Sequence, residues 1–301
     1  MNKKEKTQRK SLIYRRKARW GYVFMAPWLI VFLVFYLYPL IYGIGVSFMD
    51  YNLKDMQWNG LENYIKIFTD YRFWRSLWGT IRYAVILIPI QVFLPLWAAN
   101  TIQPHRERFK TLTKVLIYLP GVISASAMVV VWKFLLQPGT GLASSMLSLF
   151  GVEYFSIFDD ANLSIPVLSV LMGLTGLGGN LIIYSAALGG ISPDYYDAAE
   201  LDGASRSQQF WNISFPLLHG TIVYVLVTST IGTLQVFTIP KLMTAGGPNF
   251  TSSTLLMMIY DSAFNQFEFG YASALGVVLF LLLGAIAIVQ FRLTQQEVIE
   301  Y

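Results

Sequence analysis

The segment "SPDYYDAAELDGASRSQQFWNISFPLL", residues 192–218, is a short polar stretch between two of the most apolar regions of this 301-residue chain. Its charged residues are Asp194, Asp197, Glu200, Asp202 and Arg206. The chain as a whole is 55% hydrophobic and only 13% charged, with a mean hydropathy of +0.51. Because a soluble domain of this length needs far more charge to cover its surface, the composition predicts a protein that crosses a membrane several times.

Six apolar segments lie on the two sides of this stretch. Their lengths are near the ~20 residues that a helix needs to cross the hydrocarbon core of a bilayer. They are residues 21–48, 77–100, 114–132, 165–189, 217–240 and 271–291. Lipid offers the backbone no hydrogen-bond partners, so each segment is expected to form a helix. The sequence therefore predicts an all-α fold with six transmembrane helices.

Most of the 22 lysines and arginines lie in the first 19 residues or in segments on the same side of the predicted membrane. Cytoplasmic segments carry an excess of these residues, so both termini are predicted to be cytoplasmic. The net charge of +5 would suit nucleic acid, but its concentration in the tail argues against such a partner. We predict a basic tail at residues 1–19 and one six-span domain at residues 20–301.

Residues 192–216 break this charge rule, because a cytoplasmic loop is expected to be basic and this one is acidic. Ser192 can cap a helix, and Pro193 fits its first turn. Gly203 follows where a helix can end through a positive φ angle. A second helical piece is expected around residues 205–212. The plain alternative is a solvated acidic linker, but two helices joined by a glycine turn suit a surface for a partner protein.

The stretch "DAAELDGASRSQQFWNISFPLL" resembles the EAA loop of binding-protein-dependent ABC importer permeases, with Asp197 in place of the usual glutamate. Further stretches, among them "GLENYIKIF", "YLPGVISASAMVVVWKFLL" and "LQVFTIPKLMTAGGP", are similar in order to the carbohydrate-uptake branch of that family. Within it they resemble the first membrane component of maltose permeases and the A component of glycerol-phosphate permeases. The resemblance covers nearly everything after the basic tail and implies the MetI-like permease fold.

In that family the loop forms a coupling helix seated in a cleft of a cytoplasmic ATPase. The resemblance implies that role for Asp197, Ala198, Ala199, Asp202, Gly203 and Ala204. It also implies a second homologous permease subunit, two cytoplasmic ATPase subunits and an extracytoplasmic substrate-binding protein. The expected location is the plasma membrane of a bacterial or archaeal cell.

The sequence contains no site for an energy source of its own. It has no G-x-x-x-x-G-K-[ST] phosphate-binding loop. Its six apolar segments hold no Asp or Glu of the kind that proton-driven carriers load and release. ATP is therefore expected to bind the partner ATPases, with no cofactor in this chain. Zero cysteines and two histidines give no reason to predict a metal site.

Polar residues within the apolar segments are candidates for a solute pathway, because helices that face only lipid avoid them. Neutral hydroxyl and amide groups suit the hydroxyls of a sugar, and the resemblance implies that the fourth and fifth spans face the pathway. The candidates are Thr175, Gly179, Asn180, Ser229, Thr233 and Gln235. The alternative is helix packing, since Gly, Ser and Thr commonly line contacts between membrane helices.

An enzymatic function is not predicted. Tyr260 and Asp261 resemble half of an intramembrane aspartyl protease signature, but the Gly-x-Gly-Asp partner and an H-E-x-x-H motif are both missing. A membrane scaffold would leave the polar residues of the fourth and fifth segments unexplained. We predict a permease subunit that forms half of the pathway for a sugar or oligosaccharide. Glycerol phosphate or another polar solute is the alternative, with Arg82 as a candidate contact or a residue that snorkels to headgroups.

Overall fold

The computed structural model describes residues 24–150, 158, 160 and 162–294. Five helices in this part of the chain are long and apolar enough to cross a membrane: Phe24–Val46, Tyr71–Ile102, Ser164–Gly189, His219–Thr244 and Phe269–Thr294. The all-α prediction is confirmed, apart from one short hairpin of strands β1 (Met49–Tyr51) and β2 (Met56–Trp58). The predicted basic tail at residues 1–19 lies outside the described residues.

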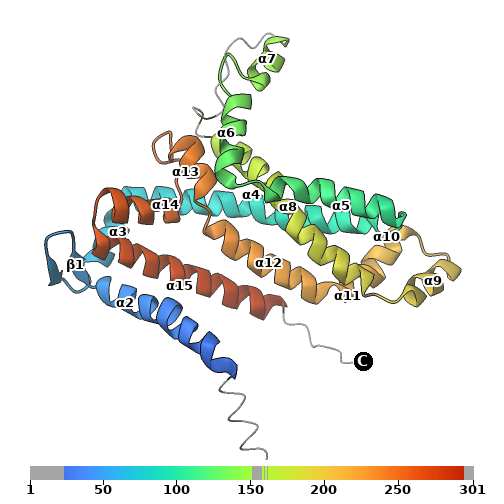
Figure 1. Ribbon diagram of the computed structural model, residues 1–301, viewed down its shortest axis with the longest axis horizontal. Helices are drawn as coiled ribbons and strands as arrows, with labels where there is room; N and C mark the ends of the chain where they lie inside the picture. Colours follow the sequence, from blue (N-terminus) through green and yellow to red (C-terminus); the bar gives the residue numbers. More distant parts are fainter. Residues whose placement is uncertain (1–23, 151–157, 159, 161, 295–301) are drawn as a thin grey trace, which may run out of the picture.

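The third predicted span, residues 114–132, is not one straight helix. It is divided between α5 (Glu107–Val122) and α6 (Ala125–Leu135), whose axes differ by 92°. Pro120 near the end of α5 removes a backbone donor, and the hydroxyl of Ser124 starts α6 by accepting the N–H of Ala127 at 3.3 Å. Figure 1 shows α6 beside α13 (Thr238–Thr244) and the short α7 (Leu142–Ser148) beyond it, away from the long helices.

The centre of the bundle is the pair α4 (Tyr71–Ile102) and α8 (Ser164–Gly189), with α5 along α8 and α12 (His219–Leu234) along α4. Small residues allow the close approach of these helices. A Cβ atom on Gly178 of α8 would lie only 2.5 Å from the Cα atom of Tyr118 in α5. The long helices run side by side along the molecule in Figure 1.

The first helix, Phe24–Val46, lies at the side of the bundle and is almost entirely exposed. It contains a π-helical turn, η1 (Leu33–Leu37), directly before α2 (Tyr38–Val46), whose second residue is Pro39. Segment α2 packs along α15 (Phe269–Thr294), which in turn contacts α12. Lipid or another protein must therefore cover most of this helix.

One end of the molecule is closed by short elements: α3 (Glu62–Thr69), α13 (Thr238–Thr244), α14 (Leu255–Tyr260) and η3 (Asp261–Asn265). Ion pairs join them to their neighbours, with 2.8 Å between Lys66 and Glu268 and 2.5 Å between Lys241 and Asp261. The segment of residues 192–218 forms the opposite end (Figure 1).

Candidate functional site

The loop begins with helix α9 (Pro193–Leu201), as the sequence predicts. The hydroxyl of Ser192 accepts the backbone N–H of Asp194 at 3.3 Å, and Pro193 occupies the first helical position. The carboxylate of Asp194 lies in the first turn, where it complements the positive end of the helix dipole. The start of α9 is therefore fixed by its own residues.

Gly203 ends the helix with a φ angle of +77°. The N–H of Ala204 donates to the carbonyl oxygen of Ala199 at 2.9 Å, and the N–H of Gly203 donates to that of Glu200 at 3.0 Å. These two bonds form a Schellman motif, which satisfies the last carbonyl groups of α9. A Cβ atom on Gly203 would meet no atom within 4 Å. Glycine is thus favoured by the backbone angle rather than by crowding.

The second arm of the loop comprises α10 (Arg206–Gln209), the π-helical η2 (Phe210–Ser214) and α11 (Phe215–Leu217). Ser205 and Gln208 form a reciprocal capping box at its start, with the N–H of Ser205 donating to Oε1 of Gln208 at 2.7 Å. The arm leads directly into α12. The predicted arrangement of helix, glycine turn and helix is confirmed.

Helix α9 is mostly exposed in the described part of the chain, where none of its residues is buried and only Tyr196 and Ala199 are half-buried. Leu201 is 90% exposed, which is unusual for a large apolar side chain. The six predicted coupling residues fall into two groups, as four are exposed and two are half-buried. The exposed ones are Asp197, Ala198, Asp202 and Gly203, and the half-buried ones are Ala199 and Ala204.

A hollow of about 650 Å³ separates α9 from the ends of α4 and α8. Asp197 and Glu200 line it from the α9 side, and Asn100 and Leu188 line it from the two spans. Within residues 162–294, the hydroxyls of Tyr196 and Ser214, 2.9 Å apart, make the one side-chain hydrogen bond that crosses from α9 to the second arm. The first arm is thus held away from the bundle rather than packed onto it.

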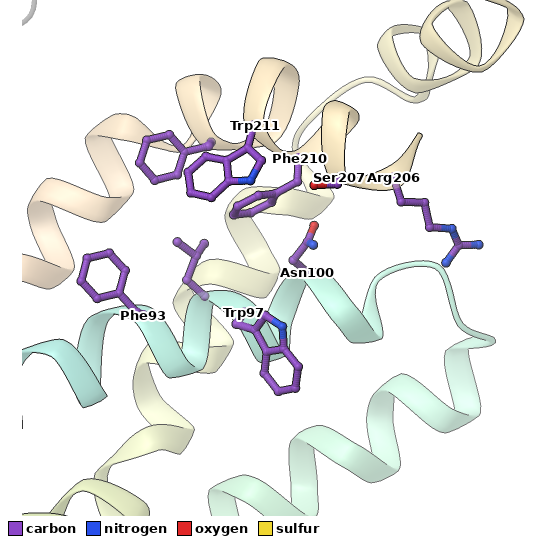
Figure 2. Close-up of a pocket in the computed structure, with 9 residues that line it drawn as sticks. Phe93, Trp97, Asn100, Arg206, Ser207, Phe210 and Trp211 are labelled. Carbon is purple, nitrogen blue, oxygen red and sulfur yellow. The ribbon is translucent and has the colours of Figure 1, made fainter. Parts of the chain in front are cut away.

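The second arm also borders a groove beside α4, drawn in Figure 2. The groove has a volume of about 470 Å³ and is lined mainly by aromatic rings. Phe93 and Trp97 lie on α4, and Phe210 and Trp211 lie on η2. The groove shares Asn100, Arg206 and Phe210 with the hollow beneath α9, but its own lining contains no acidic side chain.

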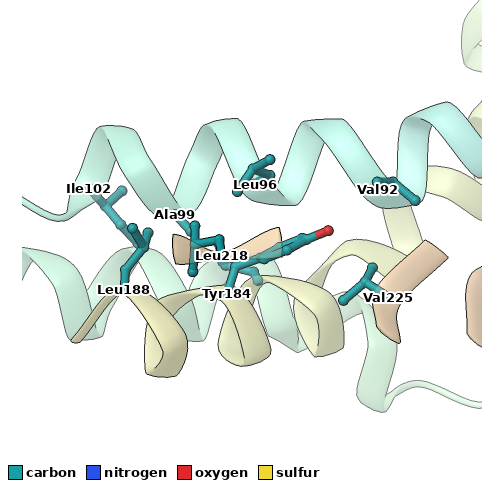
Figure 3. Close-up of a cluster of buried hydrophobic side chains, with 9 residues drawn as sticks. Val92, Leu96, Ala99, Ile102, Tyr184, Leu188, Leu218 and Val225 are labelled. Atoms are coloured by element: carbon teal, nitrogen blue, oxygen red, sulfur yellow. The ribbon is translucent and has the colours of Figure 1, made fainter. Parts of the chain in front are cut away.

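The second arm is anchored by a cluster of buried apolar side chains at this end of the bundle (Figure 3). It joins α4, α8 and α12 to Leu218, and the residues drawn include Val92, Leu96, Ala99, Ile102, Tyr184, Leu188 and Val225. Lipid is as apolar as these side chains, so the cluster stabilises the arm through close packing rather than by exclusion from water. The two arms therefore differ, one exposed and one built into the spans.

Two of the candidate pathway residues lie together. The side-chain amide of Asn180 in α8 donates to the backbone oxygen of Gln91 in α4 at 2.8 Å and to the hydroxyl of Ser229 in α12 at 3.3 Å. These contacts tie three spans, as expected of amide and hydroxyl groups between membrane helices. Asn180 and Ser229 thus have a packing role whether or not they also meet a solute.

The other four candidates do not converge on that point. The hydroxyl of Thr175 donates to backbone oxygens of its own helix, and a Cβ atom on the exposed Gly179 would meet nothing within 4 Å. Thr233 is buried, and its hydroxyl has no partner among the described residues. Gln235 is exposed where α12 ends. The six residues are spread over two spans and do not form a single pocket.

Three polar contact residues were not predicted from the sequence. Tyr196 and Ser214 join the two arms of the loop, and Gln290 in α15 donates to the hydroxyl of Thr230 in α12 at 2.7 Å. A glutamine within an apolar run was a usable signal, because amides between membrane helices usually find a partner. The Tyr196 contact depends on the fold of the loop and left no signal. In the described part of the chain, no group of three or more His, Asp or Glu residues could hold a metal ion.

Residues 71–299 match the family described as "binding-protein-dependent transport system inner membrane component". The chain is 30% identical over 289 residues to the probable ABC transporter permease protein YesP of Bacillus subtilis, a match that covers 94% of this chain and 93% of that protein. It is 26% identical to the arabinooligosaccharides transport system permease protein AraP of the same organism, over 95% of this chain and 91% of that one.

The fold is also that of a solved structure, a bacterial ABC transporter involved in the import of alginate. The TM-score is 0.80 at 22% identity, over 96% of this chain and 99% of the other. These matches confirm the resemblance and the fold class inferred from the sequence. The chain belongs to the family of binding-protein-dependent transport system inner membrane components.

Proposed function

We propose that this chain forms half of the membrane pathway of an importer for a sugar or oligosaccharide, and that a separate ATPase drives it through the loop of residues 192–216. The observation that carries the proposal is the state of α9. The helix is fixed at both ends by its own caps, yet none of its residues is buried and most of them are exposed. A rigid exposed helix joined to a packed second arm can transmit a conformational change of a partner ATPase to the spans.

The coupling residues are proposed to act in two ways. Ala198 and Ala199 keep the helix surface small enough for close approach of the ATPase, and Asp197 and Asp202 offer polar contacts to it. Gly203, with Ala204 after it, sets the angle between the two arms. The absence from the sequence of a phosphate-binding loop and of carboxylates in the apolar segments supports an external energy source. The chain is proposed to have no catalytic activity.

The proposed partners are a second homologous permease, two cytoplasmic ATPase subunits and a substrate-binding protein outside the cell. A single bundle with its first helix uncovered supports the need for a second half. One solved relative of this fold is a bacterial alginate ABC transporter in complex with a pentasaccharide-bound periplasmic protein. The proposed location is the plasma membrane, with both termini in the cytoplasm.

A sugar cargo is supported by relatives that are named for sugars. They include a multiple sugar-binding transport system permease protein of Streptococcus mutans and a lactose transport system permease protein of Rhizobium radiobacter, which are 25% and 28% identical to this chain. Thr175, Gly179, Asn180, Ser229, Thr233 and Gln235 remain the proposed pathway residues. Their hydroxyl and amide groups carry no net charge, which suits a neutral sugar.

The test is reconstitution of the complex that co-purifies with the full chain. Vesicles that contain it are expected to accumulate a labelled oligosaccharide only when ATP and the substrate-binding protein are both present. Vesicles that contain this chain alone are expected to accumulate none. Uphill uptake by the chain alone would refute the proposal, because the energy source would then lie within this polypeptide.

A further inference from the structure

The aromatic groove of Figure 2 is left uncovered by the rest of the described chain. Trp97 is 65% exposed and Trp211 is 59% exposed, although both are large apolar side chains. The groove lies between the last turns of α4 and the start of the second arm, where the spans end. Indole rings are enriched at this level of membrane proteins, where the acyl chains of lipids meet their headgroups.

Arg206 marks one end of the groove. Figure 2 shows its guanidinium extending from the start of α10, at the end away from Phe93. Arg206 is exposed and makes no ion pair within the described part of the chain. Arg206 also borders the neighbouring hollow, which the carboxylates of Asp197 and Glu200 line from the α9 side, but it forms an ion pair with neither of them. The groove thus combines an apolar trough with an unpaired positive charge at its end.

We propose that this groove binds an anionic phospholipid of the cytoplasmic leaflet, with an acyl chain along the aromatic rings and the phosphate on Arg206. An amphiphile with one negative group at its end matches both the trough and the charge. Guanidinium binds phosphate oxygens through paired hydrogen bonds. Two more arginines add positive charge at this end of the molecule. Arg106 directly precedes α5, and Arg108 lies in the first turn of α5.

The proposal rests on the proposed function in one respect, because the leaflet is cytoplasmic only if the loop of residues 192–216 faces the ATPase. It goes beyond that function, since nothing in a coupling role requires a bound lipid. A lipid at this site would contact the second arm and α4 together. It would therefore stabilise the arm through which a movement of α9 reaches the spans.

Native mass spectrometry of the full chain with its co-purifying subunits tests the site. The complex is released from nanodiscs that contain equal amounts of phosphatidylglycerol and phosphatidylcholine, and the retained lipids are counted. Wild type is expected to retain phosphatidylglycerol preferentially. Arg206→Gln is expected to reduce this preference about fivefold, the effect of one basic residue near the surface. Arg206→Lys is expected to keep most of the preference, because the charge remains.

Arg292→Gln is the matched control, because Arg292 is an exposed arginine in the last turn of α15 and does not line the groove. It is expected to leave the preference unchanged. Equal losses in the two glutamine variants would overturn the proposal, because any basic residue at the membrane surface would then serve. Trp211→Ala is expected to reduce retention of both lipids and to leave the headgroup preference in place.

Two further results would also overturn the proposal. Loss of the retained lipid on addition of soluble glycerol 3-phosphate alone would show a headgroup site without an acyl trough. Retention by the isolated chain but not by the assembled complex would show that a partner protein fills the groove. Lipid counting does not depend on transport, so a complex that binds lipid but imports nothing refutes the proposed function alone.

Discussion

The hydroxyl of Tyr196 lies 2.9 Å from the hydroxyl of Ser214, and this contact joins the exposed first arm of the loop to the packed second arm. Ser214 is only 2% exposed and belongs to η2, which leads into α12. Tyr196 is half-buried on a helix that has no buried residue. Apart from the backbone of residues 202–205, this contact is the direct polar connection by which a movement of α9 reaches the spans.

Removing either hydroxyl of this pair is expected to weaken coupling and leave the fold intact. In Tyr196→Phe or Ser214→Ala, the proposed complex should still hydrolyse ATP but import several-fold less sugar per ATP, because α9 can then move without the second arm. The ratio of uptake to hydrolysis in vesicles measures this. A merely structural role would lower the amount of folded protein instead of the ratio.

The double variant sharpens that experiment. If the two hydroxyls act only through each other, the double variant should be no worse than either single one. Tyr224→Phe is a suitable control, because Tyr224 is an exposed tyrosine of α12 whose hydroxyl forms no hydrogen bond with any described residue. Additive losses in the double variant would contradict a shared role.

Gly203→Ala is expected to impair coupling because of its backbone angle. A residue with a Cβ atom loses about 1–2 kcal/mol in the left-handed region, and no steric clash adds to this at position 203. Gly203→Asn should be milder, because asparagine tolerates positive φ. Gly220→Ala, in α12 and also without atoms within 4 Å, provides the control with ordinary helical geometry. Uptake per ATP should be lowest in Gly203→Ala, intermediate in Gly203→Asn and highest in Gly220→Ala.

Substitution by alanine should lower stability at Gly178 but not at the adjacent Gly179. Gly178→Ala places a methyl group 2.5 Å from the Cα atom of Tyr118, and the helices must separate at a cost of about 1–3 kcal/mol. Gly179→Ala meets only open space. Thermal unfolding in detergent should show a lower midpoint for the first variant alone. Normal unfolding combined with weak uptake in Gly179→Ala would support the proposed pathway role of that position.

Asp70, the residue before α4, is expected to make stability depend on pH. Partial burial alone would raise the pKa of Asp70, but the hydrogen bonds and charge of Arg72, together with the hydroxyl of Tyr271, hold this pKa below its usual value. A carboxylate with a lowered pKa stabilises the folded state above about pH 4, and that contribution disappears as the pH falls through the folded pKa.

The variant Asp70→Asn isolates this effect. Asparagine can still cap α4, but it carries no charge to pair with Arg72. The unfolding midpoint of wild type should therefore fall more steeply than that of the variant as the pH is lowered from about 6 to about 3. Parallel curves would show that other carboxylates determine the acid sensitivity of the protein.

The parts of the fold that sequence reasoning could reach are those determined by local chemistry. Apolar length marked the spans, and Ser192, Pro193 and Gly203 marked the limits of α9, because caps and positive φ angles are properties of single residues. The 92° break between α5 and α6 was missed, since residues 114–132 read as one apolar run. Hydropathy carries no information on direction, although Pro120 is a local signal of the break.

The candidate site was harder to predict because its contacts join distant residues. Asn180 and Ser229 were chosen for their polarity, but only the packing of α4, α8 and α12 places their side chains 3.3 Å apart. Gly178 and Gly179 are indistinguishable in the sequence, yet one lies against α5 and the other faces open space. Such differences depend on how the helix is rotated about its own axis. Small residues in an apolar helix do not determine this rotation.

The exposed sides of α9 have an evolutionary consequence. No residue of α9 is itself buried, and its one side-chain hydrogen bond to the second arm among the described residues is made by Tyr196, so substitutions on the outer surface of the helix leave the apolar core as it is. A lineage can therefore adapt this chain to a different ATPase by changing a few surface residues, while the geometry of the translocating half remains unaltered.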